Sequence, residues 1–410
     1  MKNVAFFTLG CRSNEFDTHL MMHQFIQKGY RVIDFEKADI YIINTCSVTA
    51  GADRSSRQAI YRAKRSNPHG LVVVTGCYAQ TNPHALSELK EVDLIVGNTH
   101  KRDILKIIEE YLEGRGEKIY VDNIFRQNSV ENFDIITYFE KVRPFVKIQE
   151  GCNRFCTFCV IPFARGKSRS VPKEKVLKEV RLLAEKGFKE VVLTGTQLTQ
   201  YGWDMGTDLY ELLVDLVKIR ELELVRLSSV YPSEISKDLL DLLLSEEKIA
   251  PHFHIPLQSG SDRILKLMKR DYQVKDYVKL IEEILKKRPI SGIGTDVIVG
   301  FPSENDEDFT KTYNLLYELP IYYLHVFPYS DRKGTKAYAM SHKVSKKVKR
   351  ERVEALKSLD YEKRKIFLEK NRGMELRALV IDENRLLTEN YINLEREGYR
   401  KIGEFLRIKI

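Results

Sequence analysis

The feature of this chain that most constrains its fold is an alternation of short apolar runs with stretches of helical spacing. Over residues 1–113 the strand-like runs lie at 4–9, 39–44, 71–75 and 94–96, and helical spacing fills the intervals, for example at 15–28 and 52–66. Strands that alternate with helices form βαβ units, which place parallel strands in one sheet with helices on both faces. We therefore predict an α/β domain with a parallel sheet for residues 1–113.

A second series of the same kind begins at residue 144. Its six strand-like runs lie at 145–149, 190–194, 224–228, 252–257, 294–299 and 323–327, and helical stretches such as 172–186, 233–244, 277–287 and 306–319 separate them. Six β/α units make a partial TIM-like barrel that is open on one side, and in such barrels the chemistry takes place on loops after the strands. We predict this barrel for residues 144–371, with a polar linker at 114–143 before it and a small β domain at 372–410 after it.

Three of the six cysteines, Cys152, Cys156 and Cys159, fall in the loop after the first strand of the predicted barrel. Thiolates this close together can hold one 4Fe–4S cluster, and because such a cluster normally has four ligands, three cysteines leave one iron open to a small molecule. A structural zinc site is the alternative, for which His252 or His254 would have to supply the fourth ligand. The C-x3-C-x2-C spacing favours the cluster.

The other three cysteines, Cys11, Cys46 and Cys77, each lie just past a predicted strand of the first domain, 35 and then 31 residues apart. Because the carboxyl ends of parallel strands meet at one edge of a sheet, we expect these thiols to converge into a second three-cysteine site. Gly10 and Gly76 beside them allow the backbone to turn tightly around a bulky group. Three unrelated buried cysteines are the alternative, since free Cys is often buried.

Composition limits where the protein acts and what it binds. A content of 43% hydrophobic and 30% charged residues is typical of a soluble globular protein, and no apolar run has the length of a signal or a membrane span. We therefore expect a cytoplasmic protein with reduced thiols and no membrane contact. The formal charge of +9 favours a polyanionic partner, with a solvated lysine-rich surface as the alternative. Residues 341–372, with twelve Lys/Arg and five Asp/Glu, predict a basic helix that is either solvated or in contact with phosphates.

Small and polar residues also stand at the ends of the later barrel strands, where they either form ordinary turns or let a ligand approach the backbone. These residues are Thr194, Gly195, Ser228, Gln258, Ser259 and Gly300. No G-x-G-x-x-G or Walker A sequence follows the first strand of the chain, so an ordinary nucleotide-binding site is not predicted there.

With both cysteine triplets and these loops, the chain resembles the methylthiotransferase family of radical S-adenosylmethionine (SAM) enzymes over essentially its full length. The resemblance implies a 4Fe–4S cluster on Cys152, Cys156 and Cys159 whose open iron binds SAM, and an auxiliary 4Fe–4S cluster on the other triplet, Cys11, Cys46 and Cys77. It also implies a C-terminal TRAM-like RNA-binding domain, unusually short here. The positions implied for SAM binding are Phe158, Thr194, Gly195, Ser228, Gln258, Ser259 and Gly300.

Segments 48–58, 226–234 and 254–262 resemble one branch of that family, which methylthiolates carbon 2 of N6-threonylcarbamoyladenosine at position 37 of tRNA. The resemblance implies a tRNA anticodon loop and a low-potential electron donor as partners. Tyr329, Arg332 and Arg165 are predicted to stack on the RNA or contact its phosphates. Neighbouring branches act on isopentenyl-adenosine in tRNA or on an aspartate of a ribosomal protein, and these remain alternatives. A non-catalytic iron–sulfur RNA-binding protein is a further alternative from another class.

Overall fold

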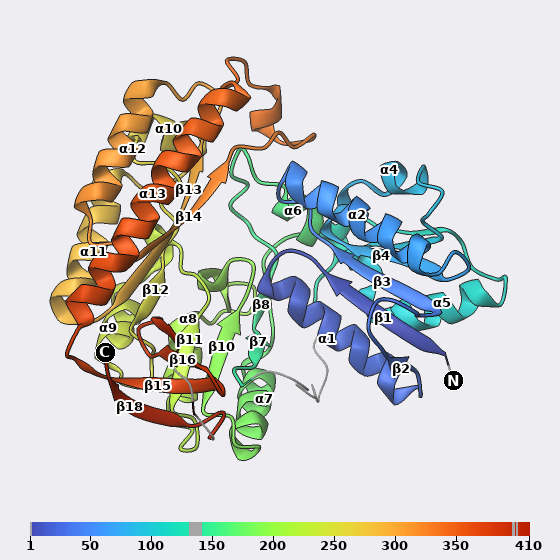
Figure 1. Cartoon of the computed structure of the whole chain (residues 1–410), viewed down its shortest axis with the longest axis horizontal. Helices are drawn as coiled ribbons and strands as arrows, with labels where there is room; N and C mark the ends of the chain where they lie inside the picture. The colour runs from blue at the N-terminus through green and yellow to red at the C-terminus, as the bar shows by residue number, and fades with distance from the viewer. Residues whose placement is uncertain (1, 131–141, 396–397, 399–400) are drawn as a thin grey trace.

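A six-stranded parallel sheet organises the N-terminal part of the chain. The computed structural model describes residues 2–130, 142–395, 398 and 401–410 (Figure 1). The sheet order is β2-β1-β3-β4-β5-β6, and β3 and β4 are buried at every position. The elements are β1 (Asn3–Thr8), α1 (Arg12–Gln27), β2 (Arg31–Val32), β3 (Ile40–Thr45), α2 (Ala50–Ser66), β4 (Leu71–Gly76), α3 (Cys77–Thr81), α4 (Pro83–Ser87), β5 (Leu94–Val96), α5 (Ile104–Leu112) and β6 (Ile119–Tyr120). Helices cover both faces, so the predicted parallel α/β sheet is confirmed.

The sheet continues into the segment 114–143, which the sequence indicated to be a linker. The edge strand β6 pairs with β5 in parallel, through Ile95 with Ile119 and Val96 with Tyr120. A strand of two residues carries no periodicity of its own, which is why the sequence pattern did not indicate it. Residues 131–141 of the same segment lie outside the described residues.

The barrel strands follow one another in chain order. The parallel sheets β7-β10-β11 and β12-β13-β14 meet where Val225 forms a bridge with Ile249, so the six strands make the predicted partial barrel. The strands are β7 (Phe145–Lys147), β10 (Glu190–Thr194), β11 (Leu224–Leu227), β12 (His252–His254), β13 (Gly292–Val299) and β14 (Tyr323–Pro328). The helices are α6 (Ile161–Arg165), α7 (Lys173–Glu185), α8 (Leu209–Leu216), α9 (Lys237–Ser245), α10 (Asp262–Leu267), α11 (Val274–Lys287), α12 (Asp306–Glu318) and α13 (Lys346–Asn371).

Five short 3-10 helices and one small hairpin complete the connections. They are η1 (Asn98–Asp103), η2 (Ile124–Arg126), η3 (Leu198–Gln200), η4 (Pro232–Glu234) and η5 (Lys336–Ala339), with the hairpin of β8 (Gln149–Glu150) and β9 (Arg169–Ser170). The hairpin brackets the loop that holds Cys152, Cys156 and Cys159.

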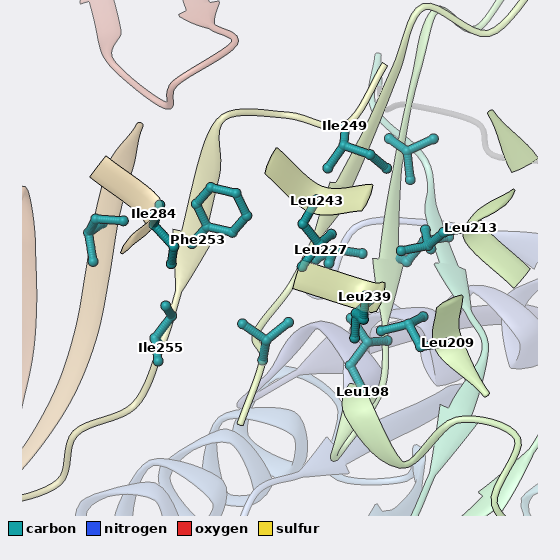
Figure 2. Close-up of a cluster of buried hydrophobic side chains, with 14 of the residues drawn as sticks. Leu198, Leu209, Leu213, Leu227, Leu239, Leu243, Ile249, Phe253, Ile255 and Ile284 are labelled. Atoms are coloured by element: carbon teal, nitrogen blue, oxygen red, sulfur yellow. The ribbon is translucent and has the colours of Figure 1, made fainter. Parts of the chain in front are cut away.

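The hydrophobic core of the barrel lies between its strands and the outer helices. Figure 2 shows Leu227 and Phe253 of the strands among Leu213, Leu243 and Ile284, which belong to α8, α9 and α11. Burying one such side chain stabilises the fold by about 1.5–3 kcal/mol. Because successive side chains of a strand point to opposite faces, the residues that alternate with this apolar set face the lumen of the barrel. The lumen can therefore carry polar groups without loss of core packing.

The C-terminal strands form a four-stranded antiparallel sheet of order β17-β16-β15-β18. Its strands are β15 (Glu375–Asp382), β16 (Arg385–Thr388), β17 (Asn393–Glu395) and β18 (Phe405–Lys409). The turn after β16 reaches the barrel, where Arg226 donates to the carbonyl of Glu389 at 3.0 Å and Tyr391 stacks on His252 at 4.0 Å. The turn thus packs at the amino ends of the strands, away from the cysteine loop. The predicted basic helix is α13, and no helix of the described residues is long and apolar enough to cross a membrane.

Candidate functional site

Cys11, Cys46 and Cys77 lie together at the carboxyl ends of the neighbouring strands β1, β3 and β4, as the strand order predicts. Cys11 caps α1 and Cys77 begins α3, and both Cys46 and Cys77 are buried. Burial raises the pKa of the Cys46 thiol to about 12, and the charge of Cys77 adds to the effect. A side chain at Gly10 would place its Cβ 2.8 Å from that of Cys46, so only glycine fits there.

Two asparagines hold the three cysteine loops in register. Asn14 donates to the carbonyls of Leu9 at 2.6 Å and Thr45 at 2.9 Å, which joins the loops after β1 and β3. Asn44 donates to the carbonyl of Asn14 at 2.7 Å. Buried side-chain amides that donate hydrogen bonds in this way fix the backbone from which the thiols project. In the sequence, this role of Asn14 is indicated by its position three residues after Cys11. We did not predict a role for Asn14.

A buried arginine, Arg165, lies beside this triplet. Its side chain is 1% exposed, and it forms ion pairs with Glu150 and with Asp17, the latter at 3.0 Å. Burial opposes its charge, yet Glu150 and the thiols of Cys77 and Cys11 raise the pKa of Arg165 well above its usual value. The prediction that Arg165 contacts RNA phosphates is therefore wrong, because the guanidinium faces the protein interior and its carboxylate partners.

The partners of Arg165 form a buried charge network between the N-terminal sheet domain and the barrel. Asp17 on α1 accepts from Lys101 at 2.7 Å and from Lys147 on β7 at 2.8 Å. Burial opposes ionisation of Asp17, but Lys101, Lys147 and Arg165 hold its pKa well below the usual value. Buried charges persist only when paired in this way, so the auxiliary cysteine site depends on the docking of the two domains.

The barrel cysteines, Cys152, Cys156 and Cys159, lie on one loop between β8 and β9, and all three are partly exposed. Burial raises the pKa of the Cys152 thiol to about 11. The loop folds back so tightly at Gly151, with φ +79°, that a Cβ there would lie 1.9 Å from the carbonyl oxygen of Lys167. This crowding explains why glycine precedes the first cysteine.

A second arginine, the partly buried Arg270, lies beside this loop. Its Nη1 is 3.6 Å from the sulfur of Cys156, and its guanidinium lies 4.8 Å from the ring centre of Tyr231 and 5.7 Å from that of Tyr272. Burial opposes its charge, yet Tyr272 and Cys156 raise the pKa of Arg270 above its usual value. Each three-cysteine site therefore has its own neighbouring cation. Arg270 lies far from the cysteines in the chain, and no motif marks it.

Buried polar atoms with no protein partner gather at the ends of β10, β11 and β12. They are the side-chain oxygens of Thr196, Ser228 and Gln258, which have no hydrogen-bond partner within the described residues. Such atoms are costly unless a ligand or water completes them, so their grouping after adjacent strands indicates a polar ligand site. Thr196 was not among the predicted positions, although it follows Gly195.

The other predicted ligand positions divide into two groups. Thr194 ends β10 and is buried beneath this edge, and Phe158 lines the cavity described below. Ser259 and Gly300 contact protein instead. Ser259 lies 3.4 Å from Thr312, and a Cβ at Gly300 would meet Lys349 at 2.4 Å.

A cavity of about 210 Å³ extends between the two cysteine sites. One wall is formed by Val48 and Thr49, from the loop after Cys46. The rest is formed by Phe158, Cys159, Val160 and Ile161 of the barrel loop and by Gln258, Asp296, Ile298, Phe327, Pro328, Tyr329 and Ser330. A single ligand in this cavity would touch the surroundings of both triplets.

Of the predicted RNA contacts, Tyr329 lines this cavity but is 5% exposed and bonds to Asp331 at 3.0 Å. Arg332 is 7% exposed and forms an ion pair with Asp53 at 2.5 Å, so the prediction that it contacts phosphates is wrong. The charges of Arg165 and Arg332 are visible in the sequence, but the carboxylates that neutralise them are not.

Comparison with known proteins agrees with this geometry. The model of the radical SAM superfamily matches residues 146–316, and that of Uncharacterized protein family UPF0004 matches residues 3–97. Among solved structures, the radical SAM methyltransferase TsrM from Kitasatospora setae shares the fold, with a TM-score of 0.60 at 15% identity over 82% of this chain and 77% of that one.

Curated relatives match over the whole chain. Threonylcarbamoyladenosine tRNA methylthiotransferase MtaB of Aquifex aeolicus is 63% identical over 99% of this chain and 100% of its own length. The protein of the same name in Bacillus subtilis is 39% identical over 100% of this chain and 94% of its own. The predicted family resemblance is thereby confirmed. The chain belongs to the radical SAM methylthiotransferases, in the MtaB-type family of tRNA-modifying enzymes.

Proposed function

We propose that this enzyme transfers a methylthio group to carbon 2 of N6-threonylcarbamoyladenosine at position 37 of tRNA, using SAM and two 4Fe–4S clusters. The names of the relatives at 63% and 39% identity support the substrate. The observation that carries the proposal is the cavity that extends between the two three-cysteine sites. An enzyme that needs both sites in one reaction must present its substrate to both.

The residues present suit these cofactors. Cysteine thiolates are the usual ligands of 4Fe–4S clusters, and each triplet leaves one iron without a protein ligand. The buried guanidinium of Arg165 or Arg270 would offset the negative charge of thiolates. The unpartnered oxygens of Thr196, Ser228 and Gln258 would complete their hydrogen bonds on SAM. When bound, the clusters and SAM supply the one-electron chemistry that an aromatic C–H with no acidic proton requires.

The protein's own contribution is to hold the base and exclude water. Ile298, Phe327 and Phe158 give the cavity apolar walls that suit a flat base. Val48 and Thr49 close it from the side of the auxiliary site. Adenosine 37 lies in a single-stranded loop, so moving it into the cavity costs only a few kcal/mol of unstacking.

Exposed basic residues beside the cavity are better candidates for phosphate contacts than the two buried arginines. Lys349 at the start of α13 donates to the carbonyl of Tyr329 at 3.1 Å, which places this helix end at the cavity. Lys346, Lys347 and Arg350 on the same turns are exposed. The proposal further includes a low-potential electron donor and a cytoplasmic location, where tRNA is modified.

The test is mass spectrometry of nucleosides from the tRNA of cells with and without the gene. We expect 2-methylthio-N6-threonylcarbamoyladenosine to disappear and its unthiolated precursor to accumulate, and a plasmid copy of the gene to restore the product. If a methylthiolated isopentenyl-adenosine disappeared instead, the substrate would be that of the neighbouring tRNA branch.

Two further results would contradict the proposal, provided that no second gene covers the activity. An unchanged nucleoside profile together with loss of a methylthiolated ribosomal protein would exclude tRNA as the substrate. Tight tRNA binding with no 5'-deoxyadenosine formed from SAM under reduction would indicate a non-catalytic iron–sulfur protein.

A further inference from the structure

Three titratable side chains meet inside the barrel beside the cavity, which one of them lines. They are His254 on β12, Asp296 on β13 and His325 on β14, three adjacent strands of one sheet. Asp296 and His325 are direct partners in the strand register. One carboxylate oxygen of Asp296 accepts from His254 Nε2 at 3.0 Å and from His325 Nδ1 at 3.2 Å. The three groups therefore form one hydrogen-bonded unit.

This unit is rigid at one end and open at the other. The second nitrogen of His254, Nδ1, lies 3.1 Å from the hydroxyl of Tyr323, which is also 2.9 Å from His252. In contrast, the side chain of His325 is 50% exposed, and its Nε2 has no hydrogen bond among the described residues. Asp296 lines the cavity. Burial opposes its ionisation, but the bonds from both histidines hold the pKa of Asp296 well below its usual value, so it is a carboxylate at neutral pH.

The polar unit lies directly below an apolar layer. Two residues further along β13 and β14, Ile298 and Phe327 are again register partners, and both line the cavity. Residues two apart on a strand point to the same face, so Asp296 and His325 face the lumen beneath that pair. From the cysteine loops inward, the cavity thus changes from apolar walls to hydrogen-bonding groups.

The shape of the substrate of the proposed function matches this order. In adenine, C2 and C6 flank N1 on the six-membered ring, and the bonds that leave the ring at these two carbons diverge. When C2 faces the loops that carry the cysteines, the bond from C6 to N6 leaves the ring away from those loops, and the substituent on N6 can extend into the lumen toward Asp296. The base would lie between apolar walls, and the substituent would reach the polar unit.

We propose that His325 and Asp296, fixed from behind by His254, form the subsite that receives the polar N6 substituent, and that this subsite selects threonylcarbamoyl-adenosine over adenosines with an apolar N6 group. The inference rests on the proposed function. A threonylcarbamoyl group offers N–H and O–H donors, and both the carboxylate of Asp296 and the Nε2 of His325 can accept hydrogen bonds from them.

Charge at the bottom of the lumen supports an anionic substituent. Arg12 donates to the hydroxyl of Tyr391 at 3.0 Å and lies 5.5 Å from the ring centre of Phe145. It has no carboxylate partner among the described residues, unlike Arg226, which pairs with Glu190 at 2.8 Å. A carboxylate entering the lumen would therefore approach an uncompensated guanidinium.

The test compares two synthetic anticodon stem–loops that differ only at position 37, one with N6-threonylcarbamoyladenosine and one with N6-isopentenyl-adenosine. Dissociation constants are measured on the holoenzyme with both clusters. We expect the wild type to prefer the threonylcarbamoyl RNA. His325→Phe and Asp296→Asn should weaken binding of that RNA by about tenfold to 100-fold, because hydrogen bonds to charged groups are lost. Binding of the isopentenyl RNA should stay within about twofold, since it offers no polar group to the subsite.

His69→Phe is the matched control, because His69 is exposed on a turn of the N-terminal domain and the replacement is the same. Iron content and circular dichroism establish that each variant is folded and loaded. An equal loss of affinity for both RNAs, or an unchanged preference in His325→Phe, would overturn this inference and leave the proposed function standing. A wild-type preference for the isopentenyl RNA would overturn the proposed function together with it. If EDTA abolished the wild-type preference, a bound cation rather than the side chains would make the contact, and the inference would be wrong.

Discussion

The two three-cysteine sites place a cation beside their thiols in different ways. At the auxiliary site Arg165 is held by carboxylates, through its ion pairs with Asp17 and Glu150. At the barrel site Arg270 is held by the aromatic rings of Tyr231 and Tyr272, and no ion pair of the described residues includes it. Carboxylates neutralise a cation fully, whereas ring faces leave most of its charge available to the thiols. From this comparison we expect Arg270 to act mainly by placing positive charge beside the thiols, and Arg165 mainly by holding the parts of its site together.

The sites also differ in what assembles them. The barrel cysteines belong to one loop, tied within the barrel by the bond from the amide of Thr157 to the carbonyl of Met268 at 3.1 Å. The auxiliary cysteines come from three strands, and the network around them joins α1 to β7 through Asp17 and Lys147. A change at the domain interface should therefore disturb the auxiliary site and leave the barrel site intact.

Removing a cysteine from each site should have the largest effect and separate the two roles. We expect Cys46→Ser and Cys156→Ser both to abolish methylthio transfer and to reduce the iron content from about eight to about four per chain. Only Cys156→Ser should also abolish formation of 5'-deoxyadenosine from SAM, because the barrel loop binds SAM in the proposed function. Iron analysis and chromatography of the SAM products check this. Loss of SAM cleavage in Cys46→Ser would mean that the two sites are not independent.

Replacing the arginines should give the next largest effect. Arg165→Met leaves the buried carboxylates of Asp17 and Glu150 short of a partner, and breaking a buried pair in this way costs about 3–5 kcal/mol. Arg270→Met loses ring contacts worth about 0.5–2 kcal/mol each and leaves no carboxylate unpaired. Thermal unfolding should therefore show the larger loss for Arg165→Met.

Lys311→Met serves as the control for this pair, since Lys311 pairs with Glu307 on an exposed face of α12. Exposed pairs contribute about 0–1 kcal/mol, so its melting temperature should match the wild type. Equal losses in the two arginine variants would contradict the difference drawn between carboxylate and aromatic surroundings.

The sequence predicted that Cys11, Cys46 and Cys77 converge. In a parallel sheet the topology alone places the carboxyl ends of the strands at one edge. It could not predict the role of Arg165, whose partner Asp17 lies 148 residues away in the chain. The charges of Arg165 and Arg332 were visible, but their neutralising partners arise only from folding. Ion pairs and hydrogen bonds between distant segments leave no periodic pattern.

In the lumen of the barrel, too, the sequence could not predict which side chains meet. A charged Asp296 inside the apolar strand β13 was a signal that sequence offered, since a charge within such a strand requires a partner. Which partners it has, His254 and His325, depends on the register of three strands. The turn that carries Tyr391 into the barrel was likewise invisible, because residues 372–410 indicated only short strands.

Acid should weaken the interface that supports the auxiliary site. Burial opposes ionisation of Asp17, but Lys101 and Lys147 hold its folded pKa well below the unfolded value of about 3.9. The stabilisation is therefore present above that unfolded value and is lost as the pH falls below it toward the folded pKa. The loss should be smaller than in Arg165→Met, because a protonated acid can still hydrogen-bond.

Thermal unfolding of the cluster-free protein between pH 7 and pH 3 measures this effect, since thiolate ligation of a cluster is itself pH-dependent. Asp17→Asn should begin less stable at pH 7 and lose less on acidification than the wild type. A parallel decline of the two proteins would assign acid sensitivity to other carboxylates, such as Glu150.

The smallest expected effect lies where the C-terminal sheet meets the auxiliary loop. Tyr391→Phe removes the hydrogen bond from Arg12 but keeps the ring stacked on His252, so the cost is about 0.5–1.5 kcal/mol. Because Arg12 follows Cys11 directly, the bond links the barrel bottom to a cysteine of the auxiliary site. If that link positions Cys11, Tyr391→Phe should slow loading of the auxiliary cluster while SAM cleavage keeps its rate. Tyr361→Phe, an exposed change on α13, controls for the loss of a hydroxyl. Equal loading rates in both variants would show that the bond between Arg12 and Tyr391 does not position Cys11.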